Sequence, residues 1–243
     1  PPNNEAQKNI SKIQSHFVAP WARGYGLAKA MIDRALEISK ENMSFVSNID
    51  SFEYKTNYNI SPQSTVPAII NNELVNTTWG YFPGWLKEQD NPRPLFNSRY
   101  ESLLEKKTFT SAFRNNRCLI PLSGWYEWRT ENDIRQPYFF YNKENLQIYT
   151  AGLFWKRSNG DIETSIITRE AVPPLDTIHN RSPLILNNFQ IESWLSDKEV
   201  DLIYDDIKNV NYEDILFHKV DTAVNNTKNI NASLINKYEE VPF

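Results

Sequence analysis

The chain has 243 residues, of which 40% are hydrophobic and 13% aromatic, and its formal net charge is -4. This composition is typical of a folded globular protein and excludes a disordered one. No apolar run approaches the roughly 20 residues that a membrane span requires, and no charged-then-apolar leader precedes a small-residue cleavage site, so a soluble cytoplasmic protein outside the membrane is expected.

The counts of cysteine, histidine and glycine restrict the chemistry further. Cys118 is the single cysteine, which excludes an internal disulfide, and three histidines form no cluster at zinc-ligand spacing. The seven glycines form neither of the usual phosphate-binding loops, GxxxxGK[ST] and GxGxxG. No metal and no nucleotide cofactor are therefore expected.

Charge is distributed unevenly along the chain. Residues 99–135 carry seven Lys or Arg against five Asp or Glu, a balance of +2, whereas residues 190–243 carry five against eleven, a balance of -6. The middle of the chain is therefore the part best suited to bind the phosphate backbone of a nucleic acid.

The predicted secondary structure changes from helical to mainly β along the chain. Apolar residues recur at helical spacing in two segments of the first fifty residues, which are separated by the glycine- and proline-containing stretch APWARGYG. From about Tyr58 the pattern favours short strands: STVPAII, LVNTTWGYF, RCLIPL, GWYEW, PYFFY, QIYTAGLFW and TSIIT. RYESLLEKKTFTSAF, FQIESWLSD and a piece near YEDILF are predicted to be helical. With no repeat or linker, we expect one α+β domain over 1–243 with a strongly curved, mostly antiparallel, barrel-like sheet and peripheral helices.

The stretch GWYEW places a carboxylate among aromatic residues. Because a strand alternates faces, Trp125 and Glu127 share one side, and Tyr126 and Trp128 share the other. Glu127 is either a solvent-facing residue of an edge strand or an acid held beside an indole.

Four other patches place polar side chains among turns: YNISP (58–62), WGYFPGW (79–85), FNSRYES (96–102) and TIHNRSP (177–183). His179 follows the turn-rich VPPLDT and is expected in a loop, as a surface residue, a satisfied core residue or an acid/base group. With Glu127 it offers a general acid/base pair if the fold brings the two together. Asn97 would orient a substrate, and Arg99 and Arg181 would hold phosphate oxygens bidentately.

Motifs in these patches resemble the SRAP family (SOS response-associated peptidase). FNSRYES followed by RCLIPLSGWYEW is similar to the family pattern N-[AS]-R-x-E, a helix, then R-C-[LI]-[IV]-P-x-x-G-[FW]-Y-E-W. YNISP, WGYFPGW, TIHNRSP and VDTAVNNTKNINASLI resemble further family segments in the same order. The resemblance covers about Tyr58 to Ile235, and residues 1–50 are interpreted as a divergent helical element of a single SRAP-like domain.

The resemblance implies an abasic-site sensor that binds single-stranded DNA and forms a covalent crosslink to it. In the family an N-terminal cysteine closes a thiazolidine on the ring-opened sugar, and the family name records a suspected self-processing peptidase activity. By motif position, Asn97, Glu127 and His179 would be catalytic, and Trp79, Arg99, Thr168 and Arg181 would line the DNA groove. The expected partner is abasic single-stranded DNA, with the protein a monomer, nucleoid-associated if bacterial.

The resemblance to the family does not extend to its nucleophilic cysteine. The chain begins PPNNEAQKNI, without the family's M-C-G-R, and Cys118 is a poor substitute because buried cysteines behave mostly as small hydrophobes. Three explanations stay open: a native N-terminus that differs, a divergent member that binds DNA without crosslinking, or attack by the secondary amine of Pro1. The alternative functions are an inactive single-stranded DNA-binding module and, less favoured, a cysteine peptidase acting on other proteins.

Overall fold

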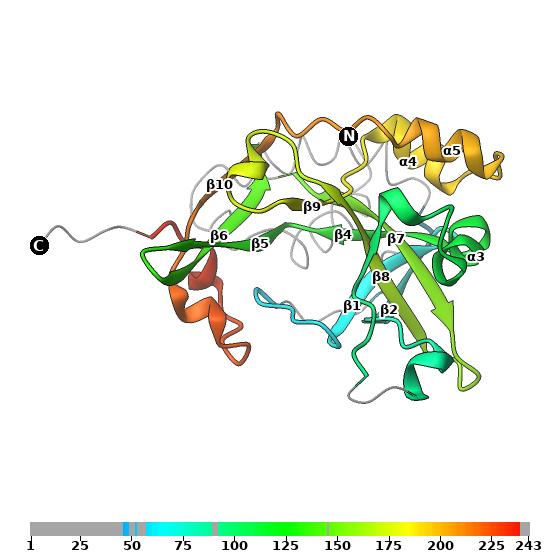
Figure 1. Ribbon diagram of the computed structural model, residues 1–243, viewed down its shortest axis with the longest axis horizontal. Coiled ribbons are helices and arrows are strands. Elements are labelled where there is room, and N and C mark those ends of the chain that lie inside the picture. Colours follow the sequence, from blue (N-terminus) through cyan, green and yellow to red (C-terminus); the bar gives the residue numbers. More distant parts are fainter. Residues whose placement is uncertain (1–45, 49–51, 53–56, 89–91, 145, 239–243) are drawn as a thin grey trace, which may run out of the picture. The chain divides into compact units, whose positions relative to one another are not determined.

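The structure is a computed structural model that describes residues 46–48, 52, 57–88, 92–144 and 146–238 (Figure 1). The two helical segments predicted within residues 1–50 lie outside these residues, as does Pro1. Unit 1 consists of Pro1–Ile60, Leu122–Ile148 and Glu213–Phe243, and unit 2 of Ser61–Pro121 and Tyr149–Tyr212. Because each unit combines segments that are far apart in the sequence, no single position of the chain separates the two.

Unit 2 is built on a barrel. Its strands are β1 (Thr65–Ile70), β2 (Glu73–Trp79), β4 (Arg117–Leu122), β7 (Ile148–Lys156) and β8 (Ile162–Glu170), in the order β2-β1-β4-β7-β8 (Figure 1). A parallel pairing between β2 and β8 joins Thr78 to Glu163 and Trp79 to Thr164, which closes the ring. The expected mostly antiparallel, barrel-like sheet is therefore confirmed, and the parallel β2–β8 pairing makes the barrel a mixed one.

The second half of β8 continues beyond the barrel. There β3 (Asn97–Arg99) runs parallel to β8, and β9 (Arg181–Pro183) runs antiparallel to it. The sequence pattern predicts neither β3 nor β9, because three residues are too few to show a period. These two short strands position most of the candidate site.

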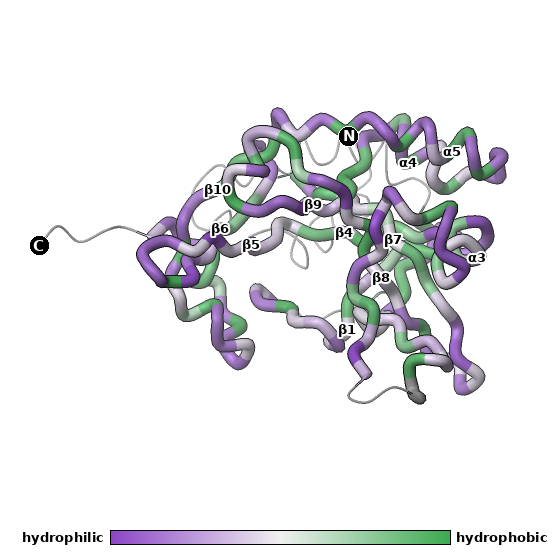
Figure 2. Tube along the Cα trace, in the orientation of Figure 1, coloured by the Kyte–Doolittle hydropathy of each residue, from purple (hydrophilic) through white to green (hydrophobic). Residues whose placement is uncertain are grey.

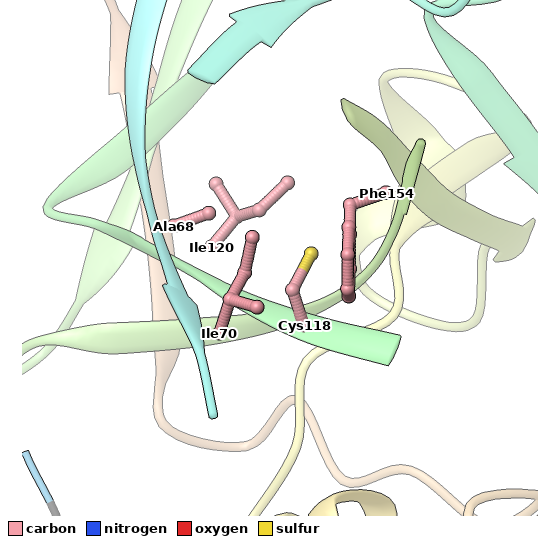
Figure 3. Close-up of a cluster of buried hydrophobic side chains, with 5 residues drawn as sticks. All are labelled: Ala68, Ile70, Cys118, Ile120 and Phe154. Carbon is pink, nitrogen blue, oxygen red and sulfur yellow. The ribbon is translucent and has the colours of Figure 1, made fainter. Parts of the chain in front are cut away.

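A compact apolar cluster lies between the barrel strands. Ala68, Ile70, Cys118, Ile120 and Phe154 are all buried and gather around the Cys118 side chain (Figure 3). Strands β4 and β7 consist mainly of hydrophobic residues, while the turn between β7 and β8 is hydrophilic (Figure 2). A Cβ on Gly152 would lie 2.9 Å from the Cys118 Sγ, so this glycine allows the close approach of the two strands.

Unit 1 contains an antiparallel sheet in the order β10-β6-β5, formed by β5 (Gly124–Glu131), β6 (Ile134–Asn142) and β10 (Ile215–Lys219). Asn132 and Asp133 both have positive φ, the conformation of the two-residue turn that joins β5 to β6. The helix predicted near YEDILF is wrong, since Ile215–Lys219 pairs with β6. Its apolar run is too short for periodicity to separate strand from helix.

Three α-helices lie in the described part of unit 2: α3 (Lys107–Asn115), α4 (Asn188–Leu195) and α5 (Val200–Asp206). The helix predicted over RYESLLEKKTFTSAF is divided into a 3-10 turn, η3 (Tyr100–Ser102), and α3. FQIESWLSD is confirmed as α4, which begins with a capping box between Asn187 and Gln190, whereas α5 was not predicted. Among the described residues no helix has the length and apolar character to cross a bilayer.

Candidate functional site

Strand β3 presents two of the predicted site residues together. Ser98, its central residue, is buried, and its Oγ lies 2.8 Å from the Oγ of Ser165 on β8. Because successive side chains of a strand point to opposite faces, burial of Ser98 directs Asn97 and Arg99 to the other face. Both residues are exposed. The sequence Asn-Ser-Arg therefore places an amide and a guanidinium on one accessible edge.

The second half of β8 brings three predicted DNA-binding residues together. Thr168 pairs with Arg99 on β3 and with Pro183 on β9. Arg181, the first residue of β9, donates a hydrogen bond of 2.7 Å from Nη2 to the Thr168 carbonyl oxygen. Arg99, Thr168 and Arg181 are therefore neighbours, and contact with DNA stays a prediction for each.

Glu101 occupies the outer edge of the Arg181 guanidinium. Arg181 donates from Nη1 to Oε1 at 2.8 Å and from Nη2 to Oε2 at 2.9 Å. The backbone N–H of Glu170 donates to the same Oε1 at 3.0 Å. Burial by itself would raise the pKa of Glu101, but the hydrogen bonds from Arg181 and from backbone amides outweigh burial and lower the pKa to about 2.

A groove of about 440 Å³ opens beside this ion pair, lined by Arg99, Glu101, Ser102, Glu105, Lys106, Glu170 and Arg181. Within the described part of the chain, Arg99 and Lys106 form no ion pair, and both are exposed. Neither Glu101 nor Lys106 was assigned a role from the sequence. The x-E of the N-[AS]-R-x-E pattern was the signal that marked Glu101.

His179 lies in the loop between η4 (Leu175–Thr177) and β9, as predicted. The half-buried ring places Nδ1 3.0 Å from the carbonyl oxygen of Arg181 and 3.2 Å from its backbone nitrogen. The tautomer decides whether Nδ1 donates to the carbonyl or accepts from the N–H. In either tautomer the ring is hydrogen-bonded to the backbone of Arg181, whose side chain contacts Glu101.

Glu127 belongs to unit 1, whereas Asn97 and His179 belong to unit 2. On β5, Glu127 is half-buried and pairs with Tyr138, and Trp125 on the same face stacks on Phe140 with ring centroids 4.9 Å apart. Strand β5 is an outer strand of the order β10-β6-β5, as the edge-strand interpretation expected, and the placement of Glu127 beside an indole stays a prediction. A meeting of Glu127 with Asn97 and His179 stays a prediction.

The opposite face of β5 has a structural role. Tyr126 donates to the carbonyl oxygen of Tyr58 at 2.9 Å, and the Trp128 indole donates to Asn225 Oδ1 at 2.7 Å. Both rings pack against the buried cluster Phe139, Val220, Val224, Leu234 and Ile235. The aromatic residues of GWYEW are therefore divided between the face that bears Glu127 and the core of unit 1.

Trp79 ends β2 and is half-buried. Its indole N–H donates to the Phe96 carbonyl oxygen at 3.0 Å, and its ring makes an edge contact with the Phe96 ring. Trp85, in η2 (Gly84–Glu88), is 49% exposed. Trp79 thus fixes the segment before β3, and Trp85 is the more accessible indole of WGYFPGW.

Comparison with known proteins gives the chain a family. The model of the SOS response associated peptidase (SRAP) family matches residues 27–227. The chain belongs to the SRAP family. The match begins inside the stretch 1–50 that the sequence motifs left unaligned.

The SRAP relatives carry informative names. Abasic site processing protein YoqW of Bacillus subtilis (strain 168) is 31% identical over 206 residues, covering 79% of this chain and 92% of that protein. Abasic site processing protein YedK of Escherichia coli (strain K12) is 31% identical over 189 residues, covering 73% and 83%. Abasic site processing protein HMCES of Xenopus tropicalis is 31% identical over 222 residues, covering 74% and 65%.

Solved structures support the SRAP fold. The crystal structure of a protein from Bacteroides thetaiotaomicron matches with a TM-score of 0.64 and 23% identity, covering 73% of this chain and 82% of that one. A protein from Bordetella bronchiseptica matches with a TM-score of 0.59 and 19% identity, covering 70% and 90%. At these identities the likeness concerns the fold alone.

Several residues of the SRAP motifs have structural roles instead of chemical ones. Asn59 of YNISP is buried, and its amide donates to the carbonyl oxygens of Val224, Asn226 and Asn229 at 2.9 to 3.2 Å. It therefore fixes the segment that contains the VNN sequence near the C-terminus. Because a buried amide without partners is costly, this contact explains the asparagine without reference to a substrate.

Cys118 of the SRAP strand RCLIP is inaccessible in the barrel (Figure 3). Burial raises the pKa of the thiol far above its usual range, so that the thiolate needed for nucleophilic attack is disfavoured. A role for Cys118 in a cysteine peptidase therefore has no structural support. Among the described residues, no group of three His, Cys, Asp or Glu side chains is placed to hold a metal ion.

Proposed function

We propose that this SRAP chain is an abasic-site processing protein and that the groove of unit 2 binds the phosphates of single-stranded DNA. The proposal depends mainly on membership of a family whose relatives above are named abasic site processing proteins. It is supported by the exposed Asn97 and Arg99 beside Thr168 and Arg181, since an amide and guanidinium groups are suited to a sugar-phosphate backbone.

The chemistry of an abasic sugar gives each predicted catalytic residue a task. The sugar interconverts between a closed ring and an open aldehyde, and this step moves a proton between the ring oxygen and the hydroxyl on C1. His179 is the acid/base group for that transfer, because an imidazole ring can both donate and accept a proton. Asn97 positions the sugar through its amide, and Glu127 accepts a proton from the attacking amine.

The covalent product proposed for the family pattern is a thiazolidine. An amine adds to the aldehyde carbon, water leaves to give an imine, and a thiol then adds across the C=N bond to close the ring. In the SRAP pattern one N-terminal cysteine supplies both groups. Within residues 1–243 the single thiol is the buried Cys118, so the nucleophile of this chain is unassigned.

A second candidate function is a binding module that holds abasic single-stranded DNA without reacting. The burial of Cys118 is compatible with it, because this thiol cannot reach a sugar. The two candidates differ in one observable, a covalent adduct.

Intact mass spectrometry tests the proposal directly. Protein with a sequenced N-terminus is incubated with an abasic single-stranded oligonucleotide, and with the same oligonucleotide carrying an intact base as a control. Crosslinking predicts an abasic-specific adduct that forms about 100-fold or more slowly in Glu127→Gln and His179→Ala, each with an unchanged circular dichroism spectrum.

Other outcomes separate the alternatives. Binding without an adduct supports the binding module. An adduct seen only after borohydride treatment, with Pro1 verified as the terminus, supports attack by its secondary amine. Absence of both binding and adduct contradicts the proposed function.

A further inference from the structure

The His179 ring is oriented by the backbone of a single residue. Its Nδ1 lies 3.0 Å from the carbonyl oxygen of Arg181 and 3.2 Å from the Arg181 backbone nitrogen. In a histidine ring, the hydrogen bond made by one nitrogen sets which of the two nitrogens carries the proton. Because Nδ1 is engaged with the backbone, the proton transfer proposed for His179 is assigned to Nε2.

The pairing of β9 with β8 explains why these backbone groups of Arg181 are available to the ring. Arg181 lies opposite Glu170, and the adjacent ladder bond runs from the Ala171 N–H to the Asn180 carbonyl oxygen at 3.0 Å. Arg181 and Glu170 are therefore a non-hydrogen-bonded pair, whose N–H and C=O groups point away from the partner strand. Those of Arg181 face His179, and those of Glu170 face the opposite edge of β8.

Glu101 occupies that opposite edge. Its Oε1 accepts the Glu170 N–H at 3.0 Å, just beyond the end of β3. The same carboxylate accepts from Arg181 Nη1 at 2.8 Å and from Nη2 at 2.9 Å, and Nη2 also donates to the Thr168 carbonyl oxygen at 2.7 Å. The Arg181 side chain thus reaches across β8 to Glu101, while its backbone faces away from β8 and holds His179.

The Arg181 guanidinium has few other partners. It is 22% exposed, and its Nε is buried without a hydrogen-bond partner in the part of the chain that the structure describes. Its position therefore depends on Glu101 and Thr168. Because a partly buried donor without an acceptor is costly, we expect the guanidinium to move when the Glu101 carboxylate is removed.

We propose that Glu101 is a positioning residue for His179: it holds Arg181 across β8 and so fixes the backbone groups that orient the His179 ring and select its tautomer. This inference rests on the proposed function and adds a residue to the predicted catalytic set. It predicts that loss of the carboxylate disturbs the ring and slows the reaction without weakening DNA binding. A purely structural role for Glu101 predicts lower stability with an unchanged ring and an unchanged rate.

The first readout is the His179 ring itself, followed in long-range proton–nitrogen correlation spectra of isotope-labelled protein under alkaline conditions in which histidine rings are neutral. His179→Ala identifies the His179 signals among those of the three histidines. The wild type should show one tautomer. Glu101→Gln should shift the ring nitrogens toward the average of the two tautomers. Glu105→Gln, which removes the same charge from the same groove, is the matched control and should keep the wild-type shifts.

The second readout is the rate of adduct formation on a trace of abasic single-stranded oligonucleotide, measured at increasing protein concentration. At saturating protein, Glu101→Gln should be slower than the wild type by about 10-fold, because a small displacement of an acid/base group is costly. The protein concentration that gives half the maximal rate should agree with that of Glu105→Gln within a factor of about 3, since both variants remove one negative charge from the groove.

The outcomes are distinguishable. Changed His179 shifts and a lower maximal rate in Glu101→Gln, with Glu105→Gln like the wild type, support the inference. Wild-type shifts or a wild-type maximal rate in Glu101→Gln overturn it. A wild type that forms no adduct contradicts the crosslinking function, and the His179 shifts then decide alone whether Glu101 positions the ring. Should Glu101→Gln fail to fold, Glu101→Asp replaces it, because it keeps the charge but is one methylene too short for all three contacts.

Discussion

Glu101 is the residue whose environment in the groove differs most from that of an ordinary surface carboxylate. Although it is exposed, it accepts two hydrogen bonds from Arg181 and one from the Glu170 backbone. These contacts favour the ionised form, and they lower its pKa from 4.5 to about 2 despite the opposing effect of burial. The pair therefore stabilises the folded state only while Glu101 is charged.

This shift predicts an acid-dependent loss of stability. The stabilisation is complete above the unfolded pKa near 4.5 and is lost as pH falls through the folded pKa of about 2. Between pH 6 and pH 3, the free energy of unfolding measured with urea should therefore fall further for the wild type than for Glu101→Gln. Equal falls for the two proteins would show that Glu101 is not stabilised by Arg181 in solution.

At the residue scale, sequence patterns locate types of side chain but not their partners. The placement of His179 in a loop was predicted, because the turn-rich VPPLDT precedes it and Arg181 and Pro183 follow it. The Glu101–Arg181 pair was not, since 80 positions separate its members and only the pairing of β9 with β8 brings them together. The bidentate phosphate contact expected of Arg181 is, in this structure, a bidentate contact with Glu101.

Arg117 shows how one side chain connects secondary structure elements. It donates to the carbonyl oxygens of Phe113 and Arg114 at the end of α3, and to those of Trp194 and Ser196 at the end of α4, at 2.7 to 2.9 Å. The last carbonyls of a helix have no partner within it, so Arg117 satisfies two helix ends and adds positive charge where it is favourable.

Replacing Arg117 by lysine should destabilise unit 2 despite the retained charge. A single ammonium group cannot reach both helix ends, and the carbonyls left without a donor should cost about 2 to 4 kcal/mol in the free energy of unfolding, measured with urea. Arg114→Lys, an exposed position in the last turn of α3, is the control and should change this free energy by less than about 0.5 kcal/mol. A similar loss in both variants would contradict the capping role.

At the element scale, hydrophobic periodicity identified the strands and helices that are long enough to show a repeat. The seven longer strands were predicted because their apolar and aromatic runs span at least five residues between turn signals. The piece near YEDILF was predicted to be helical, yet pairing of Leu216 with Tyr141 and of Phe217 with Phe140 makes Ile215–Lys219 a strand. Tertiary pairing of this kind outweighs local preference in short segments.

At the scale of the whole molecule, the predicted catalytic residues are divided between two units. Asn97 and His179 are held by β3 and by the loop before β9 in unit 2, and Glu127 is held by β5 in unit 1. The chain alternates between the units, so β5 follows β4 directly in sequence although the two strands belong to different sheets. Whether these residues act as one site is therefore a question about the assembled molecule.

A double-mutant cycle on abasic-site processing answers that question. Glu127→Gln and His179→Ala should each slow the reaction by about 100-fold or more, and the double variant should be little slower than the slower single variant, because the two residues serve successive steps and the slower step sets the rate. The rate is followed as appearance of protein-DNA adduct by intact mass, with circular dichroism to confirm folding of each variant. If the two effects multiply instead, both residues act on the same rate-limiting step, which contradicts the assignment of His179 to ring opening and of Glu127 to amine attack. An unchanged rate in Glu127→Gln would show that unit 1 does not contribute to the chemistry.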